Sequence, residues 1–360
     1  MTAGRLRTVL VTGAGAPGAV GTLHALRSNP DDTKLRIVAC DMRPDVVGGY
    51  WADVFHVIPP AEAPEFIDSL LAIGEREDVD VILPQVTREL PPLSQAAEKF
   101  RARGIAVAVS SSHAIRRAND KWFVLEAAGA CGVPYPETIV VCSEEELVRA
   151  AQKFGYPTRK VVVKPRRSNG MRGFRIVSSE VWDVRRFLEE KPGTLEVRLD
   201  DLISVLRRGD WPELLVQEYM PGSEYTVDVF RGESGVVAIP RLREEIRSGV
   251  TFRSRIEFRE DLQTFCARLS EELDLRYAFG FQFRASEEGI PKVLECNPRV
   301  QGTMVAAVFA GSNLIWYAVK EAAGQTVSQA ECRIPAHDVR LIRYWGAIAV
   351  HADGTWTGPI

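Results

Sequence analysis

Short apolar runs and helical patterns alternate along the first 110 residues of this chain. The runs lack the polar–apolar alternation of a strand with one wet face, so each is typical of a strand buried on both faces. Strands separated by helices pair in parallel, with the helices covering both faces of the sheet. We expect four strands, at 8–12, 35–40, 79–83 and 105–109, and helices through 23–26, 66–75 and 93–103.

After Ser110 the pattern changes to strands that meet through short turns. A helix is expected over 118–130, and Ser143 followed by Glu146 forms a capping box that begins another. Turns such as Pro221-Gly222 leave no room for a crossover helix, so this part is predicted to be antiparallel and α+β. The expected strands lie at 139–141, 160–165, 214–220, 224–230, 236–240 and 279–284, with a last one ending at 295.

The composition argues against several classes of function. The chain has 360 residues, enough for two or three domains, and a net charge of −3 from 45 basic and 48 acidic residues. No basic field points to nucleic acid. The six cysteines stand singly and the five histidines are scattered, which argues against zinc. Without a leader-like or membrane-spanning apolar run, we expect a cytoplasmic protein with reduced thiols.

The strongest chemical signal is a pair of strand-like runs near the C-terminal end. Gln282 lies in the first run, and Glu295 and Asn297 lie two residues apart in the second. A hairpin would bring these three oxygen ligands onto one face. Mg²⁺ is bound by few carboxylates together with substrate phosphates, and Arg299 adds a rigid fork suited to phosphate. The pattern favours a Mg²⁺–nucleotide site, and a buried polar network without metal is the alternative.

A glycine-rich turn follows the first expected strand. Gly13, Gly15 and Gly18 fit GxGxxG, and Asp41 ends the next strand at a distance suited to a ribose-binding acid. Any tight strand–helix turn favours glycine, however, and Pro17 stands where the backbone should approach a pyrophosphate. A substrate-binding or structural turn is the favoured interpretation, and an NAD(P)-dependent oxidoreductase is the alternative.

Three further segments carry weaker signals. Lys164 leaves a buried strand beside a glycine-containing loop, where it could reach phosphates or simply extend to water. The segment 216–224 could read an adenine edge or be an ordinary hairpin with a Pro-Gly turn. Six arginines between Arg241 and Arg259 predict a solvated, salt-bridged loop, in which Arg247 beside Gly249 is a candidate contact for an anionic substrate.

The order of these motifs over residues 5–325 resembles the ATP-grasp superfamily, most closely its carbamoyl-phosphate-synthase-like, large-subunit-type branch. The segments that carry the resemblance are Asn119-Asp120-Lys121, Val163-Lys164-Pro165, Gln217-Glu218-Tyr219-Met220 and Glu295-Cys296-Asn297-Pro298-Arg299. The resemblance implies a Rossmann-like pre-ATP-grasp domain (1–113), a small lid (114–205), a larger antiparallel subdomain with the metal site (206–325) and a C-terminal extension (326–360).

By position, the resemblance also implies roles for individual residues. The ATP-binding residues would be Lys121, Lys164, Ser168, Gly170, Arg172, Gly173, Gln217, Glu218, Tyr219, Met220 and Glu224. The ligands of two Mg²⁺ ions, for which Mn²⁺ can substitute, would be Gln282, Glu295 and Asn297. The catalytic residues would be Arg299 and Lys164, and the candidate substrate contacts are Gly15, Ala16, Arg247, Gln301 and Gly302.

The chemistry implied by the family is ligation of a carboxylate to an amine. The carboxylate attacks the γ-phosphorus of ATP to give an acyl phosphate and ADP, and the amine then displaces phosphate to form an amide. Phosphoryl transfer needs positioning and charge neutralisation more than a protein base. The substrates would be small molecules such as an amino acid or peptide, and the family leaves room for a homodimer. A non-catalytic ATP-binding sensor is a further alternative.

Two departures from the family pattern limit these expectations. Gln301 and Gly302 replace a longer run of small residues after the arginine, so the acceptor pocket is expected to differ. One ATP-grasp unit, without an amidotransferase domain or a second synthetase half, argues against carbamoyl phosphate synthesis itself.

Overall fold

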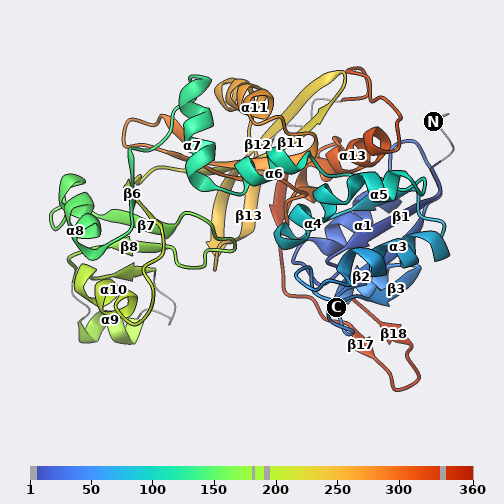
Figure 1. The fold of residues 1–360 in the computed structure, drawn as a ribbon, viewed down its shortest axis with the longest axis horizontal. Helices are drawn as coiled ribbons and strands as arrows, with labels where there is room; N and C mark the ends of the chain where they lie inside the picture. The colour runs from blue at the N-terminus through green and yellow to red at the C-terminus, as the bar shows by residue number, and fades with distance from the viewer. Residues whose placement is uncertain (1–5, 181–182, 190–194, 333–337, 360) are drawn as a thin grey trace.

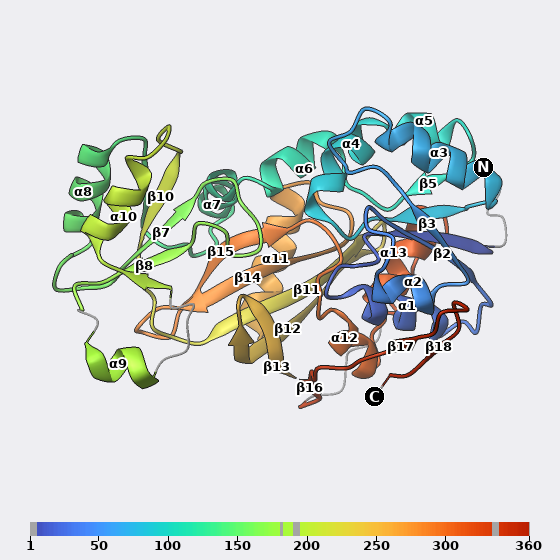
Figure 2. The ribbon, with the colours of Figure 1, turned by 90° about the horizontal axis from the view of Figure 1, so that it is seen from below.

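The protein, described here by a computed structural model covering residues 6–180, 183–189, 195–332 and 338–359, is built around three sheets. Figures 1 and 2 show the three sheets side by side along the long axis. The N-terminal sheet lies at one end and the sheet that contains β6, β7 and β8 lies at the other. Among the described helices, none is long and apolar enough to cross a lipid bilayer.

The N-terminal sheet is parallel, as the alternation predicts, with strand order β3-β2-β1-β4-β5. Its strands are β1 Thr8–Thr12, β2 Arg36–Asp41, β3 Val54–Val57, β4 Val81–Leu83 and β5 Ala106–Val107. Its helices are α1 Ala19–Arg27, α2 Val47–Trp51, α3 Phe66–Arg76, α4 Leu90–Gln95 and α5 Ala97–Arg101, with the 3-10 turn η1 Thr87–Glu89. The chain order reverses between β1 and β4, so a crevice is expected at the carboxyl ends of these strands.

Two expectations for this domain were wrong. β3 was not foreseen, because it is an edge strand whose residues are only partly buried and include a histidine. The single helix expected over 93–103 is two short helices, the first of which begins earlier, with Pro91 and Pro92 in its first turn. Proline lacks the N–H that a helix interior needs, so it is tolerated at this position and marks a helix start.

The second sheet, which we call the lid, has the order β6-β10-β7-β8-β9. Its elements are β6 Thr138–Val141, α8 Glu144–Lys153, β7 Val161–Pro165, β8 Arg175–Val177, α9 Val184–Glu189, β9 Glu196–Val197, α10 Leu199–Leu206 and β10 Leu214–Glu218. Val161 and Val163 join a core with α8 and α10, so the alternation along β7 turns Lys164 to the opposite face. The helices α6 Ser112–Ala118 and α7 Lys121–Ala130 connect the lid to the N-terminal domain.

The third and largest sheet is antiparallel, with the order β15-β14-β11-β12-β13-β16. Its strands are β11 Glu224–Gly232, β12 Gly235–Arg247, β13 Val250–Ile256, β14 Tyr277–Ala285, β15 Pro291–Asn297 and β16 Arg340–Ile342. The helices are α11 Glu260–Glu272, α12 Val305–Phe309 and α13 Leu314–Ala322. A small hairpin, β17 Ala349–Val350 and β18 Trp356–Thr357, follows and places Trp356 against Trp51 of the N-terminal domain.

The arginine-rich segment from Arg241 to Arg259 is not the solvated loop that its charges predict, because most of it forms β12 and β13. Arg241 is fully buried and pairs with the equally buried Asp228 of β11 at 2.5 Å, while it donates to Thr303 Oγ1 at 2.9 Å. Arg243 is also buried and pairs with Glu224. Acidic partners on the neighbouring strand let these arginines face inward, and an inward arginine hides the alternation that identifies a strand.

Candidate functional site

The hairpin of β14 and β15 carries a β-bulge at the centre of the site. Gln282 lies opposite Glu295, but Phe283 lies opposite Val293, so Leu294 is the extra residue. In a regular strand Val293 and Glu295 would share a face; here Val293 is buried in the core while Glu295 is partly exposed. Gln282 and Glu295, as directly opposed residues, therefore share the face that Asn297 also occupies, as the sequence predicts.

Two lysines from other elements reach this face. Lys121, at the start of α7, places its ammonium 3.7 Å from the Glu295 carboxylate and donates to the carbonyl oxygen of Ser168 at 2.7 Å. Lys164 donates to the carbonyl oxygen of the bulged Leu294 at 3.4 Å. Burial lowers the pKa of Lys164 to about 8, helped by the charge of Lys121 and opposed by Glu295 and Glu224. Two cations and one carboxylate thus meet between the lid and the large sheet.

The loop after β7 lies next to Lys121 and is held by glycines. Gly170 and Gly173 have positive φ angles of 61° and 75°, and a Cβ on Gly173 would lie 2.4 Å from Pro165 Cγ. Lys121 also donates to the Ser168 hydroxyl at 3.2 Å, while Arg172 folds back onto Asn169 of the same loop. Ser168 is therefore beside Lys121, whereas the Arg172 guanidinium is engaged within the loop.

The hinge between the lid and the large sheet contains four of the expected ATP-binding residues. Gln217 is buried and donates to Thr138 Oγ1 at 2.7 Å, and Met220 is buried as well. The Glu218 carboxylate points to the lid linker and β15, where it accepts from the backbone N–H of Glu137 at 2.9 Å and from Lys292 at 2.6 Å. The Tyr219 ring lies 5.9 Å from the Arg284 guanidinium.

Glu224, one of the expected ATP-binding residues, is paired with Arg243 and with Arg284, whose Nη1 lies 3.5 Å away. Arg243 is a neighbour of the site that the sequence did not identify. The available signal was an arginine two residues after Arg241 on the same strand, which places both side chains on one face. The ATP-binding role of Glu224 stays a prediction.

Arg299 links the large sheet to the N-terminal domain. Its guanidinium donates to Asn297 Oδ1 at 3.4 Å, to the carbonyl oxygen of Val300 at 2.8 Å and to the hydroxyl of Thr87 at 3.1 Å. Burial lowers the pKa of Arg299, and the negative charge of Glu295 opposes that shift. The sequence analysis did not identify Thr87. Nothing near it in the sequence indicates that its hydroxyl contacts a residue more than 200 positions away.

Two family models match the chain. One is described as ATP-grasp in the biosynthetic pathway with Ter operon and matches residues 210–343. The other is described as PylC-like, N-terminal domain, and matches residues 9–108. The first covers the hairpin of Gln282 and Glu295, and the second covers the parallel sheet. The chain therefore contains an ATP-grasp domain, preceded by a PylC-like N-terminal domain. The expected family and the expected α/β and α+β fold class are confirmed.

The relatives of this ATP-grasp chain include the carbamoyl phosphate synthase large chain of Thermus thermophilus, 25% identical over 252 residues. That match covers 67% of this chain but 23% of the relative, so the chain spans less than a quarter of the relative's length.

Solved structures show the same fold. The biotin carboxylase domain of Hydrogenobacter thermophilus 2-oxoglutarate carboxylase, with MgADP and bicarbonate, has a TM-score of 0.69 and 18% identity, covering 92% of this chain and 73% of that one. The N5-carboxyaminoimidazole synthetase of Staphylococcus aureus, with ADP, has a TM-score of 0.65 and 15% identity, covering 90% and 79%.

Within the ATP-grasp fold, the glycine turn after β1 packs against the large subdomain. A Cβ on Gly18 would lie 2.5 Å from the Cα atom of Gly302, so the start of α1 is covered by the segment that follows Arg299. Asp41 accepts from the backbone N–H groups of Gly15 at 2.7 Å and Arg43 at 3.0 Å. These contacts favour a structural role for the GxGxxG turn over a dinucleotide site. Asp41 already accepts hydrogen bonds from the backbone, and Gly302 covers the start of α1.

The remaining substrate candidates lie in different places. Gln301 is 7% exposed, and its amide nitrogen is buried without a hydrogen-bond partner among the described residues. Arg247 is at the end of β12, paired with Glu245 and stacked 4.4 Å from the Phe252 ring, well into solvent. Gly302 packs against Gly18, which follows Gly15 and Ala16 in the same turn, while Arg247 belongs to the β12–β13 hairpin tip.

Replacing Gly18 by Ala is expected to destabilise the protein by about 1–3 kcal/mol, because the added methyl group forces the two backbones apart. Gly18 has a φ of −101°, which alanine adopts readily, so only the contact with Gly302 opposes the change. Gly209→Ala is the matched control, since a Cβ there meets nothing within 4 Å. Thermal denaturation of both variants checks this; an unchanged Gly18→Ala melting temperature would contradict the close packing.

Glu89 predicts a pH dependence of stability. It is 6% exposed beside Thr12, whose hydroxyl donates to it, and burial raises its pKa to about 7 from an ordinary 4.5. Between those values the folded protein keeps a proton that the unfolded chain releases, so stability falls as pH rises from about 4.5 to 7. The total loss is about 3 kcal/mol at 1.36 kcal/mol per pKa unit.

Glu89→Gln mimics the protonated carboxyl and is expected to remove this part of the pH dependence. Urea unfolding should show that the free energy of unfolding of Glu89→Gln, relative to that of the wild type, is higher at pH 8 than at pH 5. The exposed Glu65, in the same domain, supplies the control Glu65→Gln. Equal pH slopes for wild type and Glu89→Gln would show that Glu89 titrates normally.

Proposed function

We propose that this protein is an ATP-dependent ligase that joins a carboxylate to an amine through an acyl phosphate, releasing ADP and phosphate. The observation that carries the proposal is the meeting of Lys121 and Lys164 with Glu295 between the lid and the large sheet. Two ammonium groups would offset the charge of a triphosphate, and Arg299, which contacts Asn297, would stabilise the phosphoryl group in transfer.

Magnesium is part of the proposal, because the donor set fits a hard cation. The described residues hold no cluster of three His, Cys, Asp or Glu side chains that could bind a metal by themselves. Gln282, Glu295 and Asn297 supply one carboxylate and two amide oxygens, so an ion there would need phosphate oxygens to complete its shell, as Mg²⁺ does. When bound, the ion neutralises the phosphates and aligns them. Two ions, with Mn²⁺ as a substitute, are the arrangement we propose.

The acceptor would bind where the large sheet meets the N-terminal domain. Arg299 and Thr87 join the two parts there, at the carboxyl edge of the parallel sheet, and Gly302 packs on the glycine turn. Ligands of open α/β sheets bind at this edge. The proposed substrates are small acids and amines, such as amino acids or peptides. We also propose a cytoplasmic location, because the six cysteines are unpaired. The proposed assembly is a homodimer.

The decisive experiment is an ADP-release screen of carboxylic acids paired with amines, in the presence of MgATP. Release that requires both partners supports the ligase. Saturable ATP binding with no release for any pair would favour the non-catalytic sensor. Saturable enhancement of NAD(P)H fluorescence without ATP binding would favour the oxidoreductase and overturn the proposal.

A further inference from the structure

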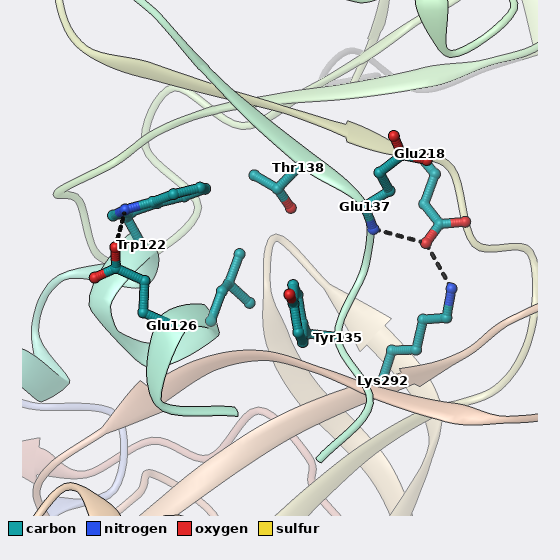
Figure 3. A pocket seen from close by; sticks show the side chains of 8 residues that line it. Trp122, Glu126, Tyr135, Glu137, Thr138, Glu218 and Lys292 are labelled. Atoms are coloured by element: carbon teal, nitrogen blue, oxygen red, sulfur yellow. Dashed lines mark hydrogen bonds and ion pairs between the residues drawn. The ribbon is translucent and has the colours of Figure 1, made fainter. Parts of the chain in front are cut away.

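A cavity lies at the hinge of the lid, and among its lining residues Glu218 alone is also assigned to ATP. Its volume is about 490 Å³, and neither Lys164, Met220 nor Glu224 lines it. Figure 3 shows Trp122 and Glu126 of α7 on one side, the Glu218–Lys292 pair on the other, and Tyr135 and Thr138 between them. Glu218 is the residue that this cavity shares with the expected adenine hinge, through its side chain.

The cavity touches both chain segments that enter the lid. Tyr135 belongs to the linker from α7 into β6, Thr138 begins β6, and Glu218 ends β10, which leads back to the large sheet. The Glu218 carboxylate ties the two together, because it accepts from the Glu137 N–H and from Lys292 of β15. A molecule in the cavity would therefore contact the lid, its two linkers and the body at once.

The lining has the chemistry of a site for an organic cation. Trp122 and Tyr135 present aromatic rings, which attract cations and planar groups. Of the three carboxylates, Glu218 is paired with Lys292 and Glu137 with Lys153 at 2.8 Å. Glu126 accepts from the Trp122 indole N–H at 2.8 Å, and no lysine or arginine of the described residues pairs with it. The unbalanced charge thus lies next to the indole.

We propose that this cavity binds a small organic cation, an aryl-alkyl amine in chemical class, with its ammonium on Glu126 and its planar body against Trp122 and Tyr135. Because the occupant contacts both linkers, its binding is coupled to the lid position and hence to ATP affinity. This coupling rests on the proposed function, whereas the binding itself does not.

The binding is tested by titration calorimetry of the full chain with phenethylamine, with the neutral 2-phenylethanol as the comparison. Saturable binding of the amine that weakens about fivefold in Glu126→Gln supports the site, the scale of losing a charge contact with an exposed carboxylate. Glu145→Gln, an exposed helix carboxylate, is the matched control and should bind as the wild type does. No saturable binding, equal binding of the alcohol, or an unaffected Glu126→Gln overturns the proposal.

The coupling is tested by measuring ATP affinity with and without saturating phenethylamine, and phenethylamine affinity with and without ATP. Linkage requires the two ratios to be equal, and we expect a factor of about 5 or more. A ratio of one in both directions, with specific binding retained, overturns the regulatory part. Absence of ADP release with every acid and amine would instead count against the ligase, and leaves the outcome of the calorimetry unchanged.

Discussion

Glu295→Gln is expected to lower ATP-dependent ADP release by roughly 10³-fold, the scale of removing a main electrostatic contact to a transferring group. The side chain keeps its shape and its place opposite Gln282 but loses the charge that faces Lys121 at 3.7 Å. It also removes the one carboxylate among the three proposed metal ligands, so phosphates and metal are no longer held together. The measurement is steady-state ADP release with the best acid and amine from the screen.

The matched control is Glu287→Gln, an exposed carboxylate in the turn of the same hairpin, which should retain full activity. Glu295→Ala combined with Asn297→Ala should abolish turnover altogether. Raising the Mg²⁺ concentration is expected to recover part of the activity of Glu295→Gln but not of the double variant. If Glu295→Gln works within a few-fold of the wild type, the assignment of the metal site is wrong.

Arg241→Met is expected to destabilise the protein by about 3–5 kcal/mol, because it leaves Asp228 charged and unpaired in the core. Both partners of this pair are fully buried, and burial raises the pKa of the Asp228 carboxyl while Arg241 opposes the rise. Chemical denaturation measures the loss. Asp228→Leu combined with Arg241→Met removes both charges and should recover most of the stability.

Arg253→Ala supplies the control for this effect, since Arg253 pairs with Glu245 at 3.2 Å on the exposed part of the same two strands. An exposed ion pair contributes at most about 1 kcal/mol. A loss in Arg241→Met no larger than that of Arg253→Ala would show that Asp228 tolerates its isolation. Arg241 also holds Thr303, four residues beyond Arg299, so the unfolding data should be compared with ADP release.

Much of this architecture could be predicted because its signals are local. Buried parallel strands such as β1 have an apolar centre that stands out in the sequence. The two-residue spacing of Glu295 and Asn297 likewise keeps both side chains on one face of β15. The bulge at Leu294 could not be predicted, since it depends on which residue of β14 each residue of β15 meets. The part of β12 after Pro240 and the whole of β13 were missed because the partners that neutralise Arg241 and Arg243 lie on another strand.

The contacts that join the parts were likewise invisible in the sequence. Thr87 meets Arg299 across the domain boundary, and Gly18 needs its glycine because of Gly302 rather than because of its own φ angle. A glycine motif that fits a nucleotide turn can thus arise from packing alone. The roles of individual residues in binding ATP, metal and acceptor stay predictions.

The extra residue in β15 also bears on how this strand tolerates changes in length. Because Gln282 stays opposite Glu295 and Phe283 stays opposite Val293, deleting Leu294 would restore regular pairing without turning Glu295 inward. What such a deletion removes is the carbonyl oxygen that Lys164 contacts. Position 294 is therefore a place where related chains can differ by one residue and still keep their ligands, and where such a difference would alter how firmly the lid is held to the body.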